Sequence, residues 1–210
     1  MVKIIADPGS CHMGNINFAK ELILAARDSG ADAIKFQLFE DKPPNIELPR
    51  EWAWQLRERA DELGIDLFFS VFDYGAMSVA VKCGCTSAKI AFSLRNDGGM
   101  INACRALFGT VYVSGDTNTD FIKDTTKLYC IPEYPVKYLI DFEGIFPRFD
   151  GFSSHCLGIK QDLFAISAGA KIIEKHIRLD NSACDSVPDG KFAIRPKEFY
   201  SLCKFGKEIK

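Results

Sequence analysis

The chain alternates short β-rich runs with helical patterns from one end to the other, and this alternation most constrains its fold. The β-rich runs occupy residues 3–6, 33–37, 67–71, 88–92, 110–114, 127–131, 151–154 and 171–177. Strands separated by helical stretches predict a parallel sheet covered by helices. Eight such units are typical of an α/β protein of the (β/α)8 TIM-barrel type. A doubly wound open sheet is the alternative, because alternation alone does not prove ring closure.

The helical stretches carry signals of their own. Apolar residues recur at three- and four-residue spacing, as at Leu22 and Ala26, and Gly30 ends that stretch just before the next strand. A last helix is expected from Pro196, since proline suits a first helical turn. The stretch between residues 114 and 127 is a poor helix former, so its helix is expected to be short. Eight helical stretches fit into 210 residues only if the loops are short.

The composition of the chain limits which classes of partner and which cellular compartment are expected. The net charge is −2 without a basic block, which argues against nucleic acid or an anionic membrane as a partner. Met1 leads directly into a β-rich run without a signal-peptide pattern, and no apolar stretch is long enough to span a membrane. Eight cysteines in a chain of this size indicate buried free thiols, so we expect a cytoplasmic protein.

Two of the three histidines close successive β-rich runs. His155 ends the seventh run and His176 the eighth, and Asp7 follows the first. In a closed barrel these strand ends meet at one rim, so we expect the two imidazoles side by side with the carboxylate next to them. Such an arc suits a divalent metal of the manganese or zinc type, although each histidine alone could be structural. His12 is expected to fix its loop by a hydrogen bond rather than to contact substrate.

Further polar residues lie at or near the ends of other strands. They are Lys35, Gln37, Ser70, Lys89 and Ser114. Their ammonium and hydroxyl groups suit a carboxylate or phosphate ligand. A lysine that points into a barrel is costly unless it is paired. The alternative to a functional Lys89 is therefore a structural ion pair with Glu174, and we favour function.

Motifs around these residues follow one another in a recognisable order. They are Ile4-Ile-Ala-Asp7-Pro-Gly9 with His12-Met-Gly14-Asn15, Gly30-Ala-Asp-Ala-Ile-Lys35-Phe-Gln37, Ser70-Val-Phe72-Asp73, Lys89-Ile-Ala91, Cys130-Ile-Pro-Glu-Tyr134-Pro135, Gly151-Phe-Ser-Ser-His155, Gly169-Ala-Lys-Ile-Ile-Glu174-Lys175-His176 and Pro188-Asp189. In this order the chain resembles the N-acetylneuraminate (sialic acid) synthase family, the NeuB-like phosphoenolpyruvate-dependent synthases. The resemblance covers nearly the whole chain.

The resemblance implies an enzyme that condenses phosphoenolpyruvate with an N-acetylated hexosamine, typically N-acetylmannosamine, to a nine-carbon 2-keto acid and phosphate. It implies that His155 and His176 hold manganese or magnesium, which polarises the sugar aldehyde. It implies catalytic roles for Asp7 and Lys35, with Asp7 managing the attacking water or its proton. The residues implied to bind phosphoenolpyruvate or the sugar are Lys35, Gln37, Ser70, Lys89, Ser93, Ser114, Tyr134, Ser153 and Asp189.

Several positions depart from the family pattern. Asp7 stands where the family has glutamate, and Phe92 takes a serine position at which Ser93 could supply the hydroxyl. Further departures are Val71, Pro132 and Ser154. The loop at 38–49 is short, and the family's C-terminal antifreeze-like domain has no counterpart, so one barrel domain is expected over residues 1–210. Members of the family usually form homodimers, and in many of them the dimer relies on the C-terminal domain. A homodimer is therefore possible here, and the oligomeric state stays open.

Three hypotheses follow. The first is an active synthase that makes a sialic-acid-like sugar acid. The second is a catalytically degenerate barrel that binds metal. The third is a metal-dependent synthase or aldolase that acts on another aldose.

Overall fold

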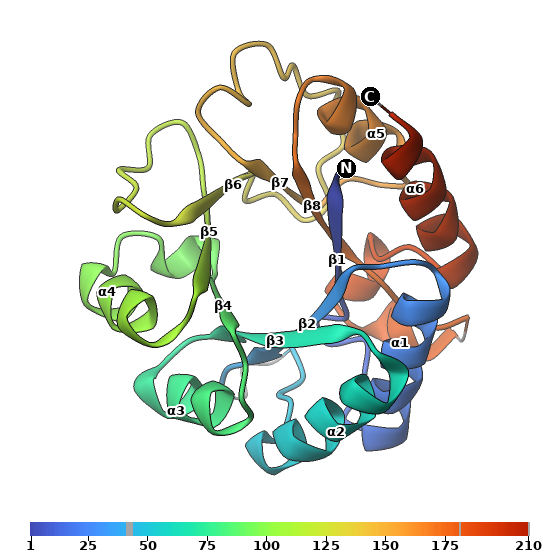
Figure 1. The fold of residues 1–210 in the computed structure, drawn as a ribbon. Coiled ribbons are helices and arrows are strands. Elements are labelled where there is room, and N and C mark those ends of the chain that lie inside the picture. The colour runs from blue at the N-terminus through green and yellow to red at the C-terminus, as the bar shows by residue number, and fades with distance from the viewer. Residues whose placement is uncertain (41–43, 181, 210) are drawn as a thin grey trace.

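Eight parallel strands close into a barrel whose strand order follows the chain (Figure 1). The computed structural model describes residues 1–40, 44–180 and 182–209. The strands are β1 (Lys3–Asp7), β2 (Ala33–Leu38), β3 (Asp66–Val71), β4 (Ser87–Ile90), β5 (Thr110–Gly115), β6 (Thr126–Cys130), β7 (Gly151–Ser154) and β8 (Ile172–His176). β1 pairs with β8 along its whole length, with Asp7 opposite His176. This pairing confirms the barrel and excludes the open sheet.

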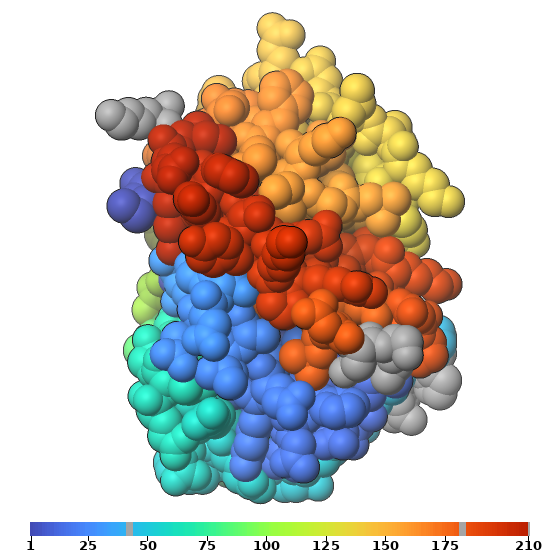
Figure 2. All heavy atoms as spheres, turned by 90° about the vertical axis from the view of Figure 1, so that its right-hand side faces the viewer, coloured from blue at the N-terminus to red at the C-terminus, as the bar shows by residue number. Residues whose placement is uncertain are grey.

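Helices cover the outside of the barrel. They are α1 (Ile16–Asp28), α2 (Ala53–Leu63), α3 (Tyr74–Lys82), α4 (Gly98–Leu107), α5 (Lys160–Ser167) and α6 (Pro196–Glu208). Short 3-10 helices add η1 (Arg50–Trp52), η2 (Phe92–Leu94), η3 (Ser182–Ser186) and η4 (Asp189–Lys191). α6 packs against α1 and α5, and Figure 2 shows the red C-terminal helix against the blue α1 on this face. The C-terminal helix thus closes the outer layer where the barrel itself closes.

The expectation of eight helical stretches is wrong. No helix follows β5 or β6 in the described part of the chain, and turns connect β5 to β6 and β6 to β7. Between β6 and β7, Pro132 and Pro135 interrupt any helical ladder. Phe142 takes the place of a helix there, because its ring packs edge-on against Phe152 of β7 at a centroid distance of 5.2 Å. The fourth β-rich run was also predicted two residues too long, since Phe92 already belongs to η2.

The barrel interior changes character along its axis. Side chains alternate between its inside and its outside along each strand. Toward the amino ends of the strands the interior is largely aromatic, with Phe68 stacked on Tyr112 at a centroid distance of 5.3 Å and Lys3 donating to the Tyr112 hydroxyl at 2.9 Å. Gly151 leaves no room for a side chain, because an added Cβ would collide with the backbone of Ile172. Toward the carboxyl ends the inward side chains become ionic, which places the polar groups where TIM barrels carry their sites.

The remaining predictions about burial agree with the structure. All eight cysteines are free and buried. Among the residues that the structure describes, no helix combines the length and apolar character needed to cross a membrane.

Candidate active site

A cavity of about 710 Å³ opens at the carboxyl ends of the strands. Every side chain predicted for the site lines it. These are Asp7, Lys35, Gln37, Ser70, Lys89, Ser93, Ser114, Tyr134, Ser153, His155, His176 and Asp189. Strand-end position predicted eight of these residues, and the family resemblance added Ser93, Tyr134, Ser153 and Asp189.

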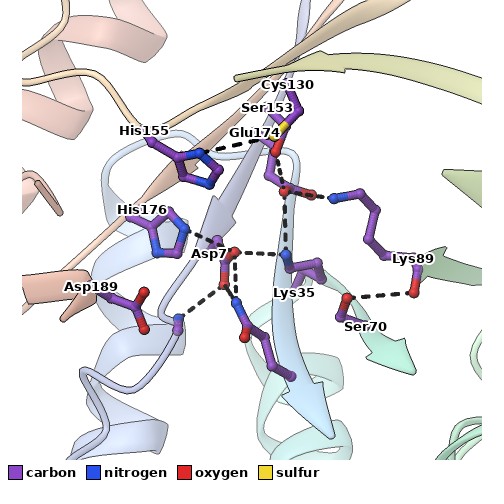
Figure 3. Close-up of polar contacts among 12 residues, drawn as sticks. Asp7, Lys35, Ser70, Lys89, Cys130, Ser153, His155, Glu174, His176 and Asp189 are labelled. Atoms are coloured by element: carbon purple, nitrogen blue, oxygen red, sulfur yellow. Dashed lines mark hydrogen bonds and ion pairs between the residues drawn. The ribbon is translucent and has the colours of Figure 1, made fainter. Parts of the chain in front are cut away.

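Asp7 lies at the centre of the polar contacts (Figure 3). Its Oδ2 is 2.6 Å from the Nζ of Lys35 and 3.3 Å from the Nε2 of His176. Gln37 Nε2 donates to both carboxylate oxygens at 3.1 and 3.2 Å, and the Gly9 amide donates to Oδ1 at 2.9 Å. Burial opposes ionisation, but His176 and Lys35 outweigh it and hold the pKa of Asp7 below its ordinary value. Asp7 is thus a fixed carboxylate between an imidazole and an ammonium.

Glu174 joins the two lysines that point into the barrel. Its Oε1 lies 2.9 Å from Lys89 Nζ and 3.3 Å from Lys35 Nζ, and it accepts a hydrogen bond of 2.9 Å from Ser153 Oγ. Burial disfavours this carboxylate, yet Lys35 and Lys89 hold the pKa of Glu174 well below its usual range. Burial lowers the pKa of Lys89 and would lower that of Lys35, but Asp7 and Glu174 raise the latter above normal. The ion pair between Lys89 and Glu174, which was the alternative to a functional Lys89, is therefore present. Lys89 also lines the cavity.

The two histidines stand side by side as predicted. Their ring centroids are 5.6 Å apart, and Figure 3 shows both on the side of Asp7 away from the lysines. His155 Nδ1 is 3.2 Å from the Ile131 carbonyl oxygen. Because a carbonyl only accepts, Nδ1 carries the proton and Nε2 keeps a lone pair. Burial and the neighbouring His176 lower the pKa of His155 to about 3, so this ring is neutral at physiological pH.

The hydroxyl groups differ in how they are engaged. Ser70 Oγ lies 3.4 Å from the carbonyl oxygen of Lys89, whereas the buried Ser114 Oγ has no hydrogen-bond partner among the described residues. Tyr134 stacks at a tilt on His155 with centroids 4.2 Å apart. Asp189 Oδ2 accepts a 2.8 Å hydrogen bond from the Ser10 amide, which ties the loop after β8 to the loop after β1.

A model of the NeuB family matches residues 43–210. The chain belongs to the NeuB family. It is 27% identical to the N,N'-diacetyllegionaminic acid synthase of Legionella pneumophila, over 95% of this chain and 69% of that enzyme. It is also 27% identical to the pseudaminic acid synthase of Helicobacter pylori, over 98% of this chain and 74% of the relative. A crystal structure of N-acetylneuraminic acid synthetase from Leptospira borgpetersenii superposes with a TM-score of 0.86 at 26% identity, covering 99% of this chain and 83% of that one.

In this NeuB-family barrel, sequence reasoning missed the aromatic part of the cavity. Phe39 and Phe72 line it and meet edge to face with centroids 5.8 Å apart. Phe192 packs against both imidazoles, with centroids 5.5 Å from His155 and 4.9 Å from His176. Phe39 and Phe72 each follow a strand end directly, a position that could have drawn attention to them. Phe192 lies far along the chain from both histidines, and no spacing signal points to it.

Two further predictions concern loops of the NeuB-family barrel. The His12 ring stays outside the cavity lining, and its Nδ1 accepts a 3.1 Å hydrogen bond from the Gly14 amide, which confirms the loop-fixing interpretation. In the loop at 38–49, Pro44 and Asn45 line the cavity, while residues 41–43 lie outside the described residues.

His155 and His176 could supply two nitrogen ligands to a metal ion, but these two residues alone do not complete a metal site. Among the described residues, no three histidine, cysteine, aspartate or glutamate side chains gather closely enough to form a ready-made metal site. His155 offers a free Nε2, and the buried Nδ1 of His176 has no hydrogen-bond partner in the described part of the chain. Two imidazoles therefore fit a metal that takes its other ligands from substrate or water.

The protonation of two histidines gives a direct pH prediction. Burial lowers the pKa of His12 to about 4 and that of His155 to about 3, from an ordinary value of 6.5. The neutral rings stabilise the fold fully above pH 6.5, and this contribution is lost as the pH falls toward those values, by up to about 1.4 kcal/mol per pH unit for each ring. An NMR titration of the metal-free protein should show neither ring titrating above pH 5. Midpoints near 6.5 for both rings would contradict the structure.

Proposed function

We propose that this protein is a phosphoenolpyruvate-dependent synthase that forms a carbon–carbon bond with the aldehyde of an N-acetylated amino sugar. The products are a nine-carbon 2-keto sugar acid and phosphate. The observation that carries the proposal is the buried arrangement of Asp7 between the imidazole pair and Lys35, open to one cavity. Relatives named as legionaminic and pseudaminic acid synthases support the same class of reaction.

Phosphoenolpyruvate would bind on the lysine side of the cavity. Lys35 and Lys89 supply ammonium groups, and the unpartnered Ser114 hydroxyl supplies a donor whose hydrogen bond is still to be made. Both lysines already face a carboxylate, so the buried charges of Lys35, Lys89, Asp7 and Glu174 balance one another. A substrate with both a carboxylate and a phosphate group therefore needs a further cation to be stable here.

His155 and His176 would hold that cation, a divalent metal. Nitrogen donors favour manganese over magnesium, because magnesium prefers oxygen ligands. When bound there, the metal would supply Lewis-acid polarisation of the acceptor aldehyde. The chain's own part is to keep His155 neutral by burial and to hold its proton on Nδ1, with Nε2 free.

Asp7 would act on the water that completes the reaction. The enol carbon of phosphoenolpyruvate bonds to the aldehyde carbon while the aldehyde oxygen takes up a proton and becomes a hydroxyl. Water then adds to the former enol-phosphate carbon, and the bond from this carbon to the phosphate oxygen breaks, which leaves the 2-keto group and inorganic phosphate. Because its pKa is held low, Asp7 is ionised at neutral pH and can accept a proton from that water. Lys35 and Gln37 fix the carboxylate in place, so the base does not have to be oriented during the reaction.

The aromatic part of the cavity would receive the acceptor's substituents. Phe39, Phe72 and Phe92 line the cavity with apolar surface that cannot pair with sugar hydroxyls. Acetamido methyl groups fit such a wall, which favours an acylated amino sugar over a plain aldose.

The test is phosphate release from phosphoenolpyruvate in the presence of manganese. We expect release that depends on N-acetylmannosamine or a diacetamido hexose, with a product mass equal to acceptor plus pyruvate. Glucose at the same concentration is the matched acceptor control. Condensation with pyruvate in place of phosphoenolpyruvate would favour an aldolase. Metal binding without phosphate release from any acceptor would favour the degenerate barrel, and both outcomes would reject the proposal.

A further inference from the structure

Lys175 occupies an unusual place for a lysine. It lies on the outer face of β8, between the inward-facing Glu174 and His176. Many outward positions of other strands carry apolar residues, such as Phe69 and Val113, although the position of β7 paired with Lys175 is Ser154. Lys175 is 0% exposed, and lysine side chains are almost never fully buried unless paired.

Three acceptors surround the ammonium of Lys175. Its Nζ donates to the Cys156 carbonyl oxygen at 2.6 Å and to Ser154 Oγ at 3.3 Å, and it lies 3.1 Å from Oδ2 of Asp162 in α5. Asp162 is also 0% exposed, so the ion pair is dry. The first two contacts are hydrogen bonds and the third is an ion pair, because neither carboxylate oxygen of Asp162 has a hydrogen-bond partner among the described residues.

Two of those acceptors flank His155 directly in the chain. Ser154 is paired in register with Lys175 across β7 and β8, and the Cys156 amide lies 3.4 Å from Ser154 Oγ. The Lys175 side chain thereby donates hydrogen bonds to the residues on both sides of His155. One ammonium thus links the backbone that carries one imidazole to the backbone that carries the other.

We propose that the Lys175–Asp162 pair positions the two histidines by fixing the end of β7 against the end of β8. A buried ion pair is a weak source of stability, and apolar side chains such as Phe69 and Val113 fill outward positions of other strands. Charge-assisted hydrogen bonds to a backbone carbonyl do fix geometry, because no water competes for them. The link holds the imidazoles at their 5.6 Å separation, and only its consequence for metal binding rests on the proposed function.

The test replaces the pair without leaving a buried charge behind. The double variant Lys175→Met with Asp162→Leu keeps the α5 contact apolar. The matched control is Lys207→Met, which removes another lysine–aspartate pair, with Asp32 at 2.8 Å, near the amino ends of the strands. Should the double variant fail to fold, Ser154→Ala removes one acceptor and no charge.

The primary readout is the imidazole NMR spectrum of the metal-free protein. The chain has only three histidines, so His12 serves as an internal reference. We expect the double variant to shift the signals of His155 and His176 and to speed exchange of the His155 Nδ1 proton, with His12 and the Lys207→Met spectrum unchanged. In Ser154→Ala the His155 signal should move less. Superimposable spectra for all three rings would overturn the inference.

Calorimetry with manganese alone is the second readout. The double variant should bind manganese about 10- to 100-fold more weakly than the wild type, as expected when groups that orient metal ligands are lost. If the wild type binds no manganese, the proposed metal site fails, while the NMR comparison still decides the role of Lys175. Equal affinities in the wild type and the double variant would count against that role.

Discussion

Glu174→Gln is expected to lower the free energy of unfolding by about 3–5 kcal/mol, because it leaves two buried ammonium groups without their shared carboxylate. Lys35 would keep Asp7, but Lys89 makes its ion pair with Glu174, at 2.9 Å. Burial already lowers the pKa of Lys89, so this lysine would lose its proton or pull the strand ends apart. Urea denaturation at pH 7 measures the change.

The matched control for this variant is Glu62→Gln. Glu62 also pairs with a cation, at 2.9 Å from Arg59, but its side chain is 58% exposed. Its loss should change stability by no more than about 0.5 kcal/mol. If Glu174→Gln unfolded with a free energy within about 1 kcal/mol of the wild type, roughly the value of one ordinary hydrogen bond, the prediction would be wrong. Glu174 would then not be needed to stabilise the two buried ammonium groups.

The second large effect is expected at the imidazole pair. His155→Gln and His176→Gln should each reduce phosphate release about a thousandfold, which corresponds to roughly 4 kcal/mol of barrier. Each variant removes one of the two nitrogen donors that face the cavity, and substitution of His176 also removes the 3.3 Å contact with Asp7. Steady-state phosphate release with manganese, phosphoenolpyruvate and the acceptor measures the loss.

His12→Gln is the matched control, because His12 lies outside the cavity lining and its hydrogen bonds go to backbone groups of Gly14 and Ile46, in the loops after β1 and β2. It should retain activity within about threefold, in line with a residue that touches neither substrate nor reacting atoms. If His176→Gln retained more than a tenth of the wild-type rate, the imidazole pair would not be at the reacting centre.

The sequence was sufficient for the barrel and for the chemistry at its rim. The spacing of apolar residues changes between strand and helix at most element boundaries. Along each strand, side chains alternate between the inside and the outside of the barrel, which shows which of them point inward. Asp7 and His176 could be placed together because ring closure joins the first strand to the last. The ion pair of Lys89 with Glu174 was foreseen only as the alternative to a functional Lys89.

Other features depend on tertiary packing, which local patterns do not encode. A helix between β6 and β7 was expected from the alternation of strands and helices, but the prolines of this segment leave Phe142 to cover β7 from a loop. The sharing of Glu174 between Lys35 and Lys89 depends on side-chain reach across the barrel. Phe192 meets both imidazoles only because the loop after β8 folds back over the cavity.

The most direct test is a crystal structure of the protein soaked with manganese and phosphoenolpyruvate. The proposed function predicts an anomalous manganese peak within bonding distance of His155 and His176, with the phosphate and carboxylate groups on the side of Lys35 and Lys89. Metal bound away from both imidazoles, or phosphoenolpyruvate absent from the cavity at saturating concentration, would contradict it.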